Sequence, residues 1–113
     1  MSAPLLDRID ALCADGSDAD DVLRGVVQAL TDEPAVAFAE IRFVEEGRLV
    51  AGPSAGAPDE ARRHVSAVDY RGGRVGELVV DGELAAAALR HVAEAISTYV
   101  LLGWDTGGTT WEP

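Results

Sequence analysis

Two segments, 35–52 and 64–81, most constrain what this chain can fold into, because each is built as a β-hairpin. Each joins two stretches in which apolar residues alternate with charged or small ones, which is the period of a strand. Each also turns on glycine, at Glu45-Glu46-Gly47 and at Gly72-Gly73. Segments of helical periodicity precede the first hairpin and follow the second. This order predicts an α+β domain with an antiparallel sheet of about four strands and helices packed on one face.

The strands are expected over 35–44, 48–51, 64–71 and 74–81, with 52–62 as a loop that holds one helical turn near Asp59–Arg62. Successive residues of a strand point to opposite faces of the sheet. One face carries apolar or small residues, and we expect the helices to cover it: Ala39, Ile41, Val68, Gly76 and Leu78. The opposite face, which we name the charged face, carries Glu40, Arg42, Asp69, Arg71 and Glu77. A sheet packed on one side alternates in this way. We therefore expect the charged face to be open or only partly covered.

The charged face also carries apolar residues, among them Val36, Phe38, Val65, Val75 and Val79. A ligand, a partner or the end of the chain could sit on that apolar part. The predicted ligand or partner contacts on the sheet are Phe38, Glu40, Arg42, Asp69 and Glu77.

Three helices are expected around the hairpins. The first opens at Pro4, and the second has Ser17 as its N-cap, acidic residues in its first turn and an end at Pro34. The last spans about 83–102, after a cap at Asp81-Gly82-Glu83. Residues 103–113 break the helical pattern and hold both tryptophans, so we assign 1–102 to a single domain and 103–113 to a C-terminal tail.

The tail is the strongest candidate for function in the sequence, because tryptophan favours anchoring at an interface. Its candidate contacts are Trp104, Asp105 and Trp111. The tail could cover its own sheet, contact a partner or second copy, or close over a ligand. Leu101 falls on the polar side of the last helix, which indicates contact on more than one side. The residues expected to make a dimer contact are Leu5, Leu6, Ile9, Leu89, Val100 and Leu101.

Composition limits the classes of partner. The formal net charge is −11 and no lysine occurs, which argues against sequence-independent binding to nucleic acid or anionic lipid. Much of the 48% hydrophobic content is alanine, so the core should be thin and a homodimer contact would help it. The chain shows no bilayer-spanning stretch and no signal peptide, and its single cysteine cannot form an internal disulfide. We expect a cytoplasmic protein without a cofactor.

Two motifs that can signal chemistry are better explained by structure. Residues 52–56, Gly-Pro-Ser-Ala-Gly, match the G-x-S-x-G pattern of a nucleophile elbow, but Pro58 makes a poor start for the helix that this motif needs. The acidic run 15–21 places Ala19 and Val26 where a calcium loop needs oxygen ligands. We interpret the first as a loop and the second as helix capping.

The histidines and the cysteine also lack a catalytic setting. His64 and His91 have neither a cysteine partner nor the spacing of a metal motif. Cys13 lies on the apolar stripe of the first helix, as a buried structural thiol would. We predict no metal site and no catalytic residue.

The order of elements resembles a reduced GAF domain, the small-molecule sensing module of bacterial regulators. Residues 20–50 are similar to the opening helix and hairpin of that family, and 66–99 to its closing strands and helix, with Gly76 at the small position. The family usually has Val-Pro-Leu where this chain has Val68-Asp69-Tyr70, and it inserts a strand and helices that roof the ligand pocket where this chain has only 52–63.

The resemblance implies a GAF/PAS-like fold and a non-enzymatic regulatory or sensory module, homodimeric, with a reduced or absent pocket. The alternative is a roadblock-like interaction scaffold without a ligand, although that family has a long helix after its first hairpin. A GAF-type methionine sulfoxide reductase is third, because its chemistry needs several cysteines and this chain has one.

Overall fold

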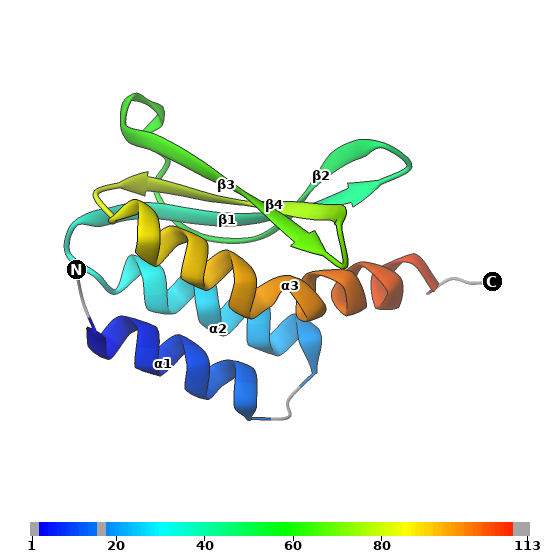
Figure 1. The fold of residues 1–113 in the computed structure, drawn as a ribbon. Helices are drawn as coiled ribbons and strands as arrows, with labels where there is room; N and C mark the ends of the chain where they lie inside the picture. Colours follow the sequence, from blue (N-terminus) through cyan, green and yellow to red (C-terminus); the bar gives the residue numbers. More distant parts are fainter. Residues whose placement is uncertain (1–2, 16–17, 110–113) are drawn as a thin grey trace.

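The computed structural model describes residues 3–15 and 18–109, with side chains for 4–15 and 18–101. The elements in chain order are α1 (Ala3–Ala14), α2 (Ala19–Thr31), β1 (Val36–Glu45), β2 (Arg48–Gly56), the single 3-10 turn η1 (Glu60–Arg62), β3 (Arg63–Tyr70), β4 (Gly73–Gly82) and α3 (Ala86–Thr109). Figure 1 shows the three helices on one side of the sheet. The predicted α+β class with helices on one face is confirmed.

The sheet has the strand order β2-β1-β4-β3, and all neighbouring strands are antiparallel. Each hairpin closes through a two-residue loop in which both residues have positive φ: Glu46 and Gly47 in the first, Arg71 and Gly72 in the second. Such loops match the twist of the strands that they join. The second turn is therefore Arg71-Gly72, one residue earlier than predicted, and Gly73 already belongs to β4.

The helices form two layers beneath the sheet. α2 packs under β1 and β2, α3 packs mainly under β3, and α1 packs on α2 and α3 (Figure 1). The predicted separation of the sheet faces is confirmed at Ile41 and Leu78, which are fully buried in the core. It is wrong for Val36 and Val75, which pack with the core because the register shifts beside each of them. The largest fully buried side chains are Ile9, Leu23, Leu30, Ile41, Leu78 and Ile96.

The segment between the hairpins differs in part from the prediction. β2 runs to Gly56 instead of ending at Ala51, because after an irregularity in register its second half pairs with β1 again, from Ser54 opposite Glu40 to Gly56 opposite Phe38. The expected helical turn is present as η1. We name residues 57–62 the crossover segment, since they connect β2 and β3, which are the two edges of the sheet.

The last helix also has different limits from those predicted. Asp81 lies in β4, as the predicted strand 74–81 had it, and neither Asp81 nor Gly82 caps the helix. β4 extends to Gly82, which has a φ of 131° and where a Cβ would lie 2.3 Å from the carbonyl oxygen of Ala35. The helix begins at Ala86 and continues to Thr109, so 103–109 are helical and do not break the pattern. None of the described helices is long and apolar enough to cross a membrane.

The predicted N-cap of the second helix, Ser17, is outside the described residues. The residue at the N-cap position of α2 is Asp18, whose side chain makes no capping hydrogen bond. Asp20 and Asp21 lie in the first turn, as predicted.

Candidate functional site

The charged face is built around Asp81, a carboxylate that is fully buried at the end of β4. Arg63, at the start of β3, lies directly opposite it in the β3–β4 register. Arg63 donates two hydrogen bonds to Asp81, from Nε to Oδ1 at 2.8 Å and from Nη2 to Oδ2 at 3.0 Å. Paired contacts of this kind fix both distance and orientation.

The crossover segment completes this arrangement. The backbone N–H of Asp59 donates to Oδ2 of Asp81 at 2.8 Å, and the carboxylate of Asp59 accepts a hydrogen bond from Arg62 Nε at 2.8 Å. We name Asp81, Arg63 and Asp59 the Asp81 clamp. It ties the crossover segment to the charged face, at the sheet end where the chain passes from one edge to the other.

The electrostatics of the clamp favour the ionised carboxylate. The hydrogen bonds from Arg63 hold the pKa of Asp81 below its ordinary value, and burial, which acts in the opposite direction, does not overcome them. Asp81 in turn raises the pKa of Arg63. The Arg63 guanidinium also lies 5.9 Å from the centroid of the Phe38 ring, a distance at which a cation is attracted to the ring face.

The structure brings together the predicted contacts on the sheet, but it pairs most of their charges with one another or with neighbours. Arg42 Nε donates to Glu40 at 2.9 Å, and Asp69 accepts from Arg74 at 3.0 Å. The Glu40 side chain is only 14% exposed. Phe38 is buried beside the clamp. The charged face is therefore only partly open.

Most of the tail and dimer contacts expected from the sequence lie outside the described side chains or inside the core. Trp104 and Asp105 lie within α3, but their side chains are outside the described part, and Trp111 lies outside the described residues altogether. Four of the six expected dimer contacts belong to the core of the single chain: Leu5, Ile9, Leu89 and Val100. Their side chains have almost no area to offer a second copy, because they are buried by α1, α3 and the sheet. Leu6 and Leu101 are half-buried.

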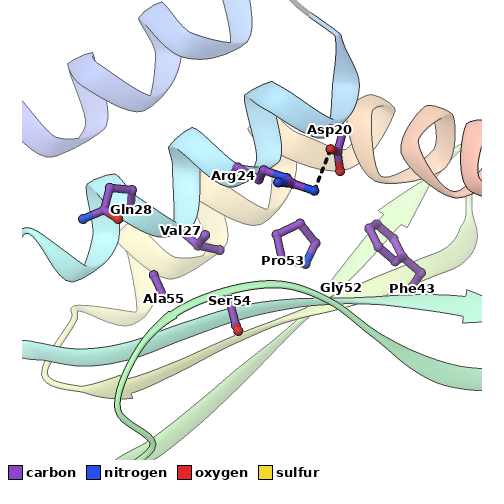
Figure 2. Close-up of a pocket in the computed structure, with 9 residues that line it drawn as sticks. All are labelled: Asp20, Arg24, Val27, Gln28, Phe43, Gly52, Pro53, Ser54 and Ala55. Atoms are coloured by element: carbon purple, nitrogen blue, oxygen red, sulfur yellow. Dashed lines mark ion pairs between the residues drawn. The ribbon is translucent and has the colours of Figure 1, made fainter.

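A concavity separate from the charged face lies between α2 and β2 and has a volume of about 550 Å³ (Figure 2). The ion pair of Arg24 and Asp20, at 3.0 Å, stands on its α2 wall, and Pro53 faces it from β2. The G-x-S-x-G residues 52–56 lie on β2 itself, and Figure 2 shows the Ser54 side chain pointing away from α2. A serine on a flat strand lacks the sharp strand-to-helix turn of a nucleophile elbow.

Cys13, predicted as a buried thiol, is half-buried; His91 is in an ion pair with Asp10, and His64 is exposed. Burial, and to a lesser degree Asp10, raises the pKa of the Cys13 thiol, which opposes thiolate chemistry. His91 Nε2 lies 3.0 Å from Asp10 and links α3 to α1, whereas His64 is exposed on β3. In the part of the chain that the structure describes, no group of three or more metal-ligating side chains comes together.

Sequence reasoning missed the Asp81 clamp, although a signal for it was present. Counting back from the two-residue turn of the second hairpin puts Arg63 opposite Val80, and the register shift between Val68 and Asp69 moves it opposite Asp81, where the opposite charges attract. Asp81 also follows three apolar residues, Leu-Val-Val, which is the composition of a buried strand and not of a helix cap.

Comparison with known proteins supports the architecture. No protein-family model matches the chain, and no curated protein matches it. Among solved structures, a GAF domain from an Acinetobacter phosphoenolpyruvate-protein phosphotransferase is similar, with a TM-score of 0.72 and 16% identity over 96% of this chain and 99% of that one. Two structures of fRMsr of Staphylococcus aureus are also similar, each with a TM-score of 0.68 and 14% identity over 86% of this chain. The match covers 94% of the fRMsr chain in complex with substrate and 93% of the chain in the reduced form. The chain therefore has the fold of a GAF domain.

Proposed function

We propose that this protein is a non-enzymatic, cytoplasmic regulatory module that acts as a homodimer and has lost most or all of the small-molecule pocket of its fold. The observation that carries the proposal is the Asp81 clamp. The GAF resemblance implies an inserted strand and helices that roof a ligand pocket where this chain has only 52–63, which are the end of β2, the crossover segment and the first residue of β3. Here the crossover segment is hydrogen-bonded to a fully buried carboxylate, which also accepts two hydrogen bonds from Arg63.

The chemistry of the described residues supports a module that is not an enzyme. The lone Cys13 has a raised pKa and lies in α1, on the opposite side of the core from the charged face. The similar structure fRMsr was determined with a substrate, so a catalytic role has to be tested directly. The other similar structure is a domain from a phosphotransferase, which supports a module that regulates a partner protein.

Thermal shift measurements test the loss of the pocket. Cyclic nucleotides, haem and methionine sulfoxide are the probes, and we expect none of them to raise the melting temperature of the full chain. A ligand at a hundred times its Kd would stabilise the folded state by about 2.7 kcal/mol, so a true ligand is readily seen. A saturable shift with any of the three would contradict the proposal.

Two further measurements test the non-enzymatic role and the homodimer. Incubation with methionine sulfoxide and a dithiol reductant should yield no methionine above a protein-free control, and turnover would make the protein an enzyme. Light scattering at micromolar concentration should give twice the mass of the 113-residue chain. A mass of one chain would remove the homodimer.

A further inference from the structure

β3 is an open edge of the sheet. It pairs with β4 on one side only, so the N–H and C=O groups along its other side have no strand partner. It contains no proline and no lysine, the residues that commonly protect such an edge. Val65, a residue of β3, is at 49% the most exposed of the large apolar side chains on the described surface.

A groove of about 400 Å³ runs along this edge, between β3 and α3. Ser66, Ala67 and Asp69 line it from β3, and Arg90, Ala93 and Glu94 line it from α3. Arg90 and Glu94 are both exposed, and within the described part of the chain neither side chain has an ion-pair partner. The groove thus combines small side chains in its middle with two unused opposite charges one helical turn apart.

We propose that the occupant of this groove is a second copy of the chain, and that two β3 edges pair antiparallel about a two-fold axis at Ser66. The two sheets then form one continuous sheet of eight strands, twice the four of a single chain. The inference rests on the homodimer of the proposed function and assigns its interface.

Charge selects the register of this pairing. With the axis at Ser66, Arg63 of one copy stands opposite Asp69 of the other, whose Oδ1 also accepts from Arg74 of its own chain. Val65 stands opposite Ala67, which covers the exposed valine. Arg63 uses Nε and Nη2 for Asp81, which leaves its Nη1, 3.9 Å from Glu60, to face Asp69. With the axis one residue later, at Ala67, Arg63 would stand opposite Arg71, and like charges directly opposite are unfavourable.

The same axis makes the helical side of the groove self-complementary. It relates α3 to its copy in antiparallel orientation, so Arg90 of one copy faces Glu94 of the other, and the reverse contact is made by symmetry. Ala93 also lines the groove, but it is buried in the core of its own chain, so the helical contacts between copies are made by Arg90 and Glu94. A patch that matches itself in this way is what a two-fold interface requires.

The opposite edge of the sheet is less suited to a second copy. Along β2, Pro53 supplies no N–H, and the register with β1 shifts between Glu40 and Arg42. Exposed Leu49 and Val50 at the start of β2 leave it as the competing interface. The test therefore compares the two edges.

Cross-linking tests the register. In a Cys13→Ala background, Ser66→Cys should form a disulfide-linked dimer on mild oxidation, because residues paired across the axis have the Cα separation that a disulfide needs. Ser54→Cys on β2, in the same background, is the matched control and should stay a single chain on a non-reducing gel. Cross-linking at position 54 but not at 66 would overturn the proposal.

A charge swap tests the helical contacts by sedimentation equilibrium. Arg90→Glu sets like charges against each other and should weaken the dimer by about tenfold or more, while Arg90→Glu with Glu94→Arg should restore it. Arg48→Glu, at the tip of the first hairpin, changes the net charge equally and should have no effect. If the dimer resists Arg90→Glu or is lost in Arg48→Glu, this interface is wrong but the homodimer stands. If the unmodified chain is monomeric up to about 100 µM, both the interface and the homodimer are wrong.

Discussion

Replacing Asp81 with alanine is expected to destabilise the protein by about 3 kcal/mol, one of the largest effects of any single charged residue in the chain. The carboxylate is fully buried and accepts three hydrogen bonds, two from Arg63 and one from the backbone of Asp59. Its removal leaves a guanidinium and a backbone N–H without their acceptor. The folded state therefore loses the pair and keeps the desolvation cost of the remaining partner.

The magnitude follows from how far the partner can return to water. Breaking a fully buried ion pair costs about 3–5 kcal/mol. The Arg63 side chain is 23% exposed and can be partly rehydrated, so the lower end of that range applies. With an unfolding entropy of about 2.1 cal/mol/K per residue, a domain of 113 residues changes its free energy by about 0.24 kcal/mol per degree near the midpoint. The melting temperature should fall by about 12 °C.

Urea unfolding followed by circular dichroism measures this free energy directly. Asp20→Ala is the matched control, because Asp20 also pairs with an arginine, at 3.0 Å, but its side chain is 60% exposed. Its loss should cost less than about 1 kcal/mol, including its contribution at the start of α2. If Asp81→Ala cost no more than Asp20→Ala, the carboxylate would not be buried and paired as described, and the reasoning would fail.

Three further predictions concern pH, packing and the thiol. The pKa of Asp81 is lower in the folded than in the unfolded chain, because of the hydrogen bonds from its arginine partner. As pH falls, the Asp81 carboxylate is protonated first in the unfolded chain. The free energy of unfolding that this group contributes above about pH 4 is therefore lost as pH falls through the lowered pKa. Asp81→Asn should make the free energy of unfolding less dependent on pH in urea titrations between about pH 7 and pH 3. Gly76→Ala would set a Cβ 2.2 Å from the carbonyl oxygen of Arg42 and should cost about 1–3 kcal/mol in the same assay. Gly73→Ala, whose Cβ would meet its nearest atom at 3.7 Å, should be nearly neutral by comparison. The Cys13 thiol, whose pKa burial raises, should react slowly with a thiol reagent at about pH 8 until urea unfolds the chain, and fast labelling of the folded protein would contradict its position.

The sheet was predictable because its signals are local. Alternation along β1 and β4 assigns Ile41 and Leu78 to one face and Glu40 and Glu77 to the other, since the period of a strand is two residues. The glycine turns fix the pairing within each hairpin, although not the central pairing of β1 with β4. These signals need no knowledge of distant parts of the chain, and the structure follows them to within a few residues, with the second half of β2 as the exception.

The Asp81 clamp was missed because it depends on contacts between segments distant in sequence. Asp81 ends the predicted strand 74–81, but its partner Arg63 is 18 residues away and comes opposite it only through the register shift between Val68 and Asp69. The limits of α3 were missed for a related reason. Glycine disfavours helix by about 1 kcal/mol, which predicts an end near Leu102, yet the helix continues past Gly103 to Thr109.

The clamp also explains how a short connection can cross a sheet without a helical roof. Replacing a buried ion pair by apolar residues of similar size is often neutral or stabilising, so net stability alone does not account for an aspartate at this position. A carboxylate accepts hydrogen bonds, which depend on direction, whereas the packing of an apolar side chain does not. Both of its oxygens accept from Arg63, and Oδ2 also accepts the backbone N–H of Asp59. One residue thereby ties the start of β3 and the path of the crossover segment to the end of β4.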